Sequence, residues 1–142
     1  IRIQGAIANC KNLIDENNDI QPIETGIGTV YAIINTCKNV VIANNRFANW
    51  ASIINNDGDY SIIKGNSVIN TRGDATTGYG ILDTSDKSII DGNVLEGTYQ
   101  GIGLTADSSN AVVSNNVIRA DNTTISDVGT GTVKQNNIEI VY

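Results

Sequence analysis

The chain alternates short aliphatic runs with asparagine pairs, and this pattern recurs along most of its length. The first clear copy is "VVIANNRF" (Val40 to Phe47), where strand-like residues run into two asparagines and then become apolar again. Asparagine is disfavoured in strands, so a single copy would indicate a turn. Four more copies follow, namely "SIIKGNSV", "SIIDGNVL", "AVVSNNVI" and "TVKQNNIE". The pattern therefore predicts a repeating structure.

The spacing of the copies is that of a solenoid coil. Aligned on the second asparagine, the copies place Asn45, Asn66, Asn93, Asn116 and Asn137 at gaps of 21, 27, 23 and 21 residues. A second strand-like segment lies within each repeat: "YAIIN", "WASIIN", "YGILD", "QGIGL" and a weaker "TTIS". A weaker sixth copy, "IRIQGAI", opens the chain with Ile3 aligned on Ile63, and an insertion over residues 9–28 follows it.

Helical and leucine-rich repeats need ten or more residues with a 3.6-residue period, and a propeller blade needs about forty residues. We therefore expect an all-β parallel β-helix of about six coils, forming one domain over residues 1–142. The asparagines are expected at the corners, where they tolerate left-handed backbone and form amide ladders between coils about 4.8 Å apart. The chain begins with strand-like sequence and no initiator methionine, so we expect a fragment of a longer chain.

The motif [IV]-[IV]-x-[GN]-N-x-[IVLF], alternating with G-I-x-L, resembles the repeat of the pectate-lyase superfamily. The resemblance covers Val40 to Tyr142 well and Ile1 to Asn39 loosely, and "GTGTVKQNNI" is similar to the last coils of its members. Those members include phage tail spikes and extracellular polysaccharide lyases, hydrolases and epimerases. The resemblance implies a right-handed parallel β-helix, an extracellular or virion location and a polysaccharide partner, and it allows a homotrimer.

Composition and charge narrow the function. The net charge is −6, and the nine basic residues are scattered, which argues against a nucleic-acid partner. No apolar run approaches the length of a membrane span. The polygalacturonase and mannuronan epimerase branches of the superfamily need histidine motifs, and this chain has no histidine. The two cysteines, Cys10 and Cys37, match no metal spacing, and whether they pair stays open.

Aromatic residues precede the second strand of four consecutive coils, at Tyr31, Trp50, Tyr79 and Tyr99. Their spacing follows the coil length, so we expect them in a column. Flat rings along an extended groove suit sugar binding, although such a stack could instead plug the core at a corner. Arg72 lies in the long Gly-rich loop "NTRGDATTGYG" and is a further candidate for substrate binding.

Aspartates cluster just after the second strand, and Asp57, Asp83 and Asp107 are the candidate catalytic residues. A glycoside hydrolase needs two carboxyl groups about 5 to 10 Å apart, which one or two coil steps would allow. A polysaccharide lyase would need a basic residue beside them, and calcium would use the same carboxylates as ligands. No other cofactor is expected. The alternative is that aspartate is simply a favoured turn residue.

The sequence is consistent with two functions. The first is a polysaccharide-binding or polysaccharide-cleaving segment of an extracellular or tail-spike-like protein, as a hydrolase or lyase if it is an enzyme. The second is a non-catalytic structural shaft or spacer. An ice-binding face would need a regular Thr-x-Thr ladder, which the sequence lacks. Aromatic and aspartate columns that face outward on the same side would favour the first function.

Overall fold

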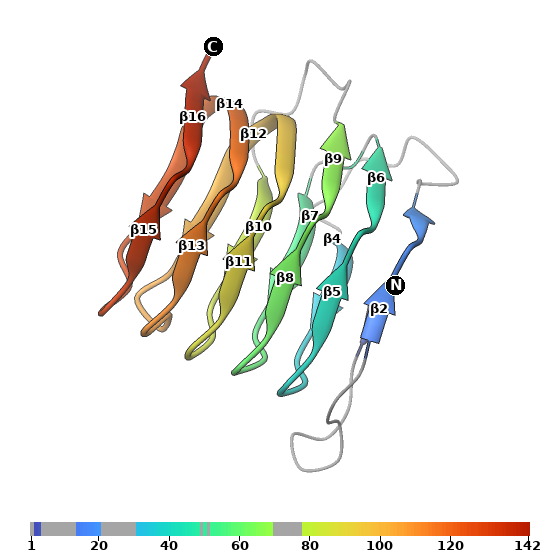
Figure 1. The fold of residues 1–142 in the computed structure, drawn as a ribbon, viewed down its shortest axis with the longest axis vertical. Coiled ribbons are helices and arrows are strands. Elements are labelled where there is room, and N and C mark those ends of the chain that lie inside the picture. The colour runs from blue at the N-terminus through green and yellow to red at the C-terminus, as the bar shows by residue number, and fades with distance from the viewer. Residues whose placement is uncertain (1, 4–13, 21–30, 49, 51, 70–77) are drawn as a thin grey trace.

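The chain forms an all-β parallel solenoid of about five turns (Figure 1). This computed structural model describes residues 2–3, 14–20, 31–48, 50, 52–69 and 78–142. No helix occurs among these residues, and every strand pairing between them is parallel. The predicted fold class is therefore confirmed.

One face of the solenoid is a six-stranded sheet made from the first strand of each repeat. Its order is β15-β13-β11-β8-β5-β2, so neighbouring strands belong to consecutive coils, and Figure 1 shows them side by side. The strands are β2 (Ile14–Glu16), β5 (Val41–Ala43), β8 (Ile62–Lys64), β11 (Ile89–Asp91), β13 (Val112–Ser114) and β15 (Val133–Gln135).

A ten-stranded sheet forms the remaining two faces. Earlier coils use two separate strands for these two faces, whereas the long strands β12 and β14 each extend across both. Because β12 pairs with both β9 and β10, the two faces belong to one sheet. Its first face contains β3 (Asp19–Ile20), β6 (Arg46–Ala48), β9 (Ser67–Ile69) and β16 (Ile138–Val141). Its second face contains β1 (Arg2–Ile3), β4 (Tyr31–Asn35), β7 (Ser52–Asn56) and β10 (Tyr79–Asp83). The strands common to both are β12 (Val94–Leu104) and β14 (Val117–Asp127).

The core is a stack of aliphatic side chains, because like positions of successive coils are in register. Ile33 pairs with Ile54, Ile54 with Ile81, and Ile81 with Ile102, and all four are fully buried. The six-stranded sheet contributes a second buried row, Ile42, Ile63, Ile90 and Val113. Each row fills the interior with β-branched residues of similar shape, which suits a parallel sheet.

The two positions of the asparagine pair have different roles. The first position has positive φ in every complete repeat, for example Asn44 (φ 55), Gly65 (φ 62) and Gly92 (φ 63). The second position is the buried ladder: the Nδ2 of Asn66 donates to Oδ1 of Asn93 at 3.0 Å, and Asn93 donates to Asn116 at 3.0 Å. The predicted amide ladder is therefore confirmed, and the left-handed corner belongs to the residue before it.

The predicted first coil was placed wrongly. Ile3 does not align with Ile63; β1 pairs instead with β4, with Ile3 opposite Asn35, so it belongs to the second strand of a coil. The first copy of the asparagine motif is β2, where Ile14 pairs with Val41, and it lies inside the segment interpreted as an insertion. The predicted six coils thus become about five turns.

Cys37 is buried and disulfide-bonded. The other cysteine of the sequence, Cys10, lies outside the described residues. Of the residues described, none belongs to a helix long and apolar enough to cross a bilayer.

Candidate binding surface

The strand register separates the four predicted aromatic residues. Tyr31 pairs with Ser52 and not with Trp50, and Tyr79 pairs with Gln100 and not with Tyr99. Ile54 pairs with Ile81, so Ser52 and Tyr79 share a position on neighbouring coils. Tyr31 and Tyr79 therefore share one position two coils apart, which is about 10 Å along the axis. The predicted four-membered column is wrong for Trp50 and Tyr99.

Tyr79 lies on the outer face of the sheet because the start of β10 departs from strict alternation. A Cβ at Gly80 would meet the side chains of Leu95 and Thr98, both buried, so Gly80 faces the interior and the preceding Tyr79 faces outward. Gly103 sits between the buried residues Ile102 and Leu104, so strand alternation directs its missing side chain outward. A Cβ at Gly103 would lie 2.4 Å from Cε1 of Tyr79, so the ring covers this glycine. Burial and the nearby Tyr79 together raise the pKa of Tyr31. The two tyrosines thus form one half-buried aromatic surface.

Trp50 has a structural contact. Its indole Nε1 donates to the carbonyl oxygen of Ile20 at 3.2 Å, and its ring packs against the core. Tyr99 is half-buried beside Gln100, one residue out of register with Tyr79. Arg72 lies outside the described residues.

The three candidate catalytic aspartates do not lie together. Asp83 is fully buried, and its side chain accepts hydrogen bonds from Asn56 Nδ2, Ser85 Oγ and Ser88 Oγ, each at 2.7 Å. Asp57 is exposed and accepts a hydrogen bond from Thr84 at 2.9 Å. Asp107 is exposed in the longer turn after β12. The sequence clustered these residues by proximity to a strand end, but the interior and the exterior alternate there.

The two-residue period of the second strand would have predicted the burial of Asp83. Asp83 follows the buried Ile81 by two residues, as Asn35 follows Ile33 and Asn56 follows Ile54. Residues two apart in a strand share a face, so Asp83 belongs to the interior. Burial raises its pKa, against the opposing effect of its hydrogen bonds.

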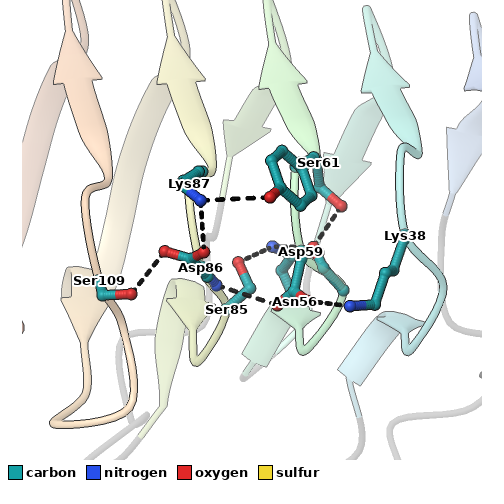
Figure 2. A network of polar contacts seen from close by, with 10 residues as sticks. Lys38, Asn56, Asp59, Ser61, Ser85, Asp86, Lys87 and Ser109 are labelled. Carbon is teal, nitrogen blue, oxygen red and sulfur yellow. Dashed lines mark hydrogen bonds and ion pairs between the residues drawn. The ribbon is translucent and has the colours of Figure 1, made fainter.

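An exposed polar network follows the corner before the six-stranded sheet (Figure 2). Lys38 pairs with Asp59 at 2.5 Å, and Lys87 pairs with Asp86 at 3.2 Å. Lys87 also donates to the hydroxyl of Tyr60 at 3.2 Å and lies 5.0 Å from the centroid of its ring. Sequence reasoning did not single out Tyr60, although it is 47% exposed. The sequence feature that could have identified Tyr60 is a bulky residue at the corner position that Asn39 and Asn110 occupy in other coils.

The half-buried carboxyl groups of Asp59 and Asp86 are held ionised. Hydrogen bonding to Lys38 lowers the pKa of Asp59, and hydrogen bonds from Ser109 and Asn110 lower the pKa of Asp86 to about 2. A glycosidase acid must carry a proton near neutral pH, which requires a raised pKa. Asp83 has the raised pKa but no exposed surface, so neither group provides an accessible acid. Among the described residues, no three His, Cys, Asp or Glu side chains group to hold a metal ion, so the expected calcium site gains no support.

No family model matches the chain, and a search of curated proteins finds no similar sequence. The established result is therefore the fold, a parallel β-solenoid.

Proposed function

We propose that the chain is a polysaccharide-binding segment of an extracellular or virion protein related to the pectate-lyase superfamily. The observation that carries this proposal is the shared outward position of Tyr31 and Tyr79. Tyrosine offers a flat apolar face with a polar tip, and this suits the faces and hydroxyl groups of sugar rings. A glycan chain would run along the solenoid axis and contact both rings.

Binding without cleavage fits the carboxyl groups better than catalysis does. Burial raises the pKa of Asp83, but this residue is fully buried under its own hydrogen bonds. Asp57 and Asp107 are exposed but lie on turns of different coils, with Asp107 in a turn that is two residues longer. The surface therefore supports recognition of a polysaccharide, with Tyr31 and Tyr79 as its contact residues.

The test is a glycan-array screen, followed by affinity measurements on any polysaccharide that binds. We expect Tyr79→Ala and Tyr31→Ala each to weaken binding by roughly tenfold, because each removes one stacking contact. The matched control is Tyr142→Ala, since Tyr142 is 68% exposed and lies far along the axis from β4. Equal affinity of all three variants would contradict the assignment of the surface. Cleavage products in mass spectrometry would contradict binding without catalysis.

A structural shaft or spacer is the second candidate. The observation favouring it is the amide ladder, which runs without interruption from Asn18 to Asn137 and stiffens the solenoid along its length. Failure of the folded chain to bind any glycan would favour this function.

A further inference from the structure

The outer face of the six-stranded sheet carries two rows of side chains. One row is aliphatic and consists of Val41, Ile62, Ile89, Val112 and Val133. Ile89 is 40% exposed and Val133 is 50% exposed, while the residue after Ile89, Ile90, is fully buried. The second row lies two residues further along each strand, where Lys64 and Gln135 are exposed and Asp91 is half-buried, whereas Ala43 is fully buried and Ser114 is only 6% exposed.

The four central coils are arranged as a palindrome. Their sequences are "NVVIANN", "YSIIKGN", "KSIIDGN" and "NAVVSNN", starting at Asn39, Tyr60, Lys87 and Asn110. The two inner coils resemble each other, and the two outer coils resemble each other. The point of reflection falls between β8 and β11, which is also the middle of the six-stranded sheet. A two-fold axis at this point would place each inner coil against the other inner coil and each outer coil against the other outer coil, so similar side chains would face each other.

We propose that this face is an interface between two copies of the chain, packed antiparallel about a two-fold axis that runs along the strands between β8 and β11. In this arrangement Ile62 of each copy packs on Ile89 of the other, and Val41 packs on Val112. Lys64 of each copy meets Asp91 of the other. Aliphatic side chains therefore bury against aliphatic ones, and opposite charges meet twice.

Charge decides between this orientation and a parallel one. A two-fold axis parallel to the solenoid and midway between the rows would place Ile62 against Lys64 and Ile89 against Asp91 of the other copy. That arrangement buries charged groups against apolar ones, which is unfavourable. Lys64 forms no ion pair of its own among the described residues. Hydrogen bonds from Ser114 and Asn115, and the charge of Lys64 on the adjacent strand, lower the pKa of Asp91 within one chain. In the antiparallel dimer each ammonium would therefore face the Asp91 carboxylates of both copies.

Of the two corner glycines at the point of reflection, only Gly92 allows a close approach, because the Oδ1 of Asn44 lies 2.6 Å from the Cβ position of Gly65. Gly65 and Gly92 occupy the positive-φ position in the inner coils, where the outer coils have Asn44 and Asn115. A Cβ at Gly92 would have no heavy atom within 4 Å in its own chain. The space above this glycine is thus open to a neighbouring molecule.

The size of the face predicts a weak dimer. Six strands spaced by about 4.8 Å and three residues long give a face of about 24 by 10 Å. This is well below the roughly 800 Å² per partner of a standard stable interface, so association should be reversible and concentration-dependent.

Sedimentation velocity of the 142-residue chain, from micromolar to about millimolar concentration, tests the proposal. We expect a reversible monomer–dimer equilibrium. Lys64→Asp leaves two facing pairs of carboxylates across the axis, and Asp91→Lys leaves two facing pairs of ammonium groups. Each variant alone should dimerise at least about tenfold more weakly than the wild type, because like charges then meet. Glu96→Lys, on a different face, makes the same change in charge as Asp91→Lys and should leave dimerisation unchanged.

Mixing the two variants separates an interface from an effect within one chain. The chain carrying Lys64→Asp complements the chain carrying Asp91→Lys, so an equimolar mixture should form a heterodimer at concentrations where each variant alone is mainly monomeric. Circular dichroism would establish that each variant is folded. The proposal is overturned by a wild type that stays monomeric at the highest concentration, by a trimer, by single variants that dimerise as tightly as the wild type, or by a mixture that associates no better than each variant alone.

Discussion

Two polar ladders run through the interior of this solenoid, and they end differently. The corner ladder passes through every coil as asparagine, ending at Asn137. The strand ladder begins with Asn35 and Asn56, which are linked by a hydrogen bond of 2.7 Å. It then ends in the carboxylate of Asp83, and the next coil places the apolar Leu104 at the same position.

The difference follows from the direction of the hydrogen bonds. Asn66, Asn93 and Asn116 each donate Nδ2 to the asparagine of the next coil. Each of their Oδ1 atoms accepts a hydrogen bond from the asparagine of the previous coil. A buried polar group without a partner destabilises the fold by about 1–3 kcal/mol, so a ladder that meets an apolar coil needs a last member that only accepts. A carboxylate meets that requirement, since it has no donor to satisfy when ionised.

Removing a middle member of the corner ladder should have the largest effect. Asn93→Ala leaves the backbone N–H and the Nδ2 of Asn66 without their acceptor, and it removes the donor to Asn116. We expect a loss of about 4 kcal/mol in the free energy of unfolding, because several buried groups lose partners at once. Urea unfolding followed by the fluorescence of the single tryptophan, Trp50, would measure it.

The matched control for this substitution is Asn115→Gly at the neighbouring exposed corner. Asn115 has φ 56, which glycine adopts readily, so the stability should change by less than about 1 kcal/mol. Similar losses for both variants would contradict the division of roles between the two asparagine positions.

Removing the acceptor that ends the strand ladder should have an intermediate effect. Asp83→Leu would leave Asn56 Nδ2 and the hydroxyls of Ser85 and Ser88 without the carboxylate. It also removes a charge whose burial is unfavourable, which offsets part of the loss. The expected net loss is about 2 kcal/mol. Urea midpoints would reveal it, and unchanged stability would show that the carboxylate is not needed to end the ladder.

The smallest effect should be a pH dependence carried by Asp83. Its pKa in the folded protein is raised above the ordinary value of 3.8, so the folded state keeps the proton while the unfolded state has lost it. Stability from this group is therefore greatest below pH 3.8 and falls as pH rises through the folded pKa. Asp83→Asn has no carboxyl group to titrate. Its free energy of unfolding relative to the wild type should therefore increase as the pH rises from 3.8 through the folded pKa of Asp83.

Urea titrations of both proteins at several pH values would measure this difference. The other carboxyl groups, including Asp86 with its lowered pKa, occur in both proteins and cancel in the comparison. A difference that stays constant with pH would contradict the raised pKa of Asp83.

The repeat was predictable because one physical requirement recurs in each coil: two aliphatic residues, a left-handed corner and a buried amide. The first coil escaped prediction because Asp15 stands where the next four coils have Ile42, Ile63, Ile90 and Val113. The apolar signal was therefore absent in the coil that contains β2. Its asparagine pair, Asn17 and Asn18, was the remaining indication, and Asn17 does have positive φ.

The candidate site was less predictable, because it depends on register within turns of unequal length. Tyr31 and Tyr79 begin β4 and β10, whereas Trp50 precedes β7 by two residues and Tyr99 lies within β12. A shift of one or two residues therefore moves Trp50 and Tyr99 out of the column. A shift of one residue changes the face of a strand, so proximity along the sequence could not place Asp57 and Asp83 on one side.

The donor–acceptor direction of the corner ladder also affects how such a chain can change its length. An asparagine coil presents an acceptor to the preceding coil and a donor to the following one, so a duplicated copy would fit between any two neighbours. A coil of the Asp83 type cannot be copied in this way, because its carboxylate has nothing to donate to a second carboxylate stacked above it. Gain and loss of coils by duplication or deletion should therefore be tolerated along the corner ladder and resisted at the coil that contains Asp83.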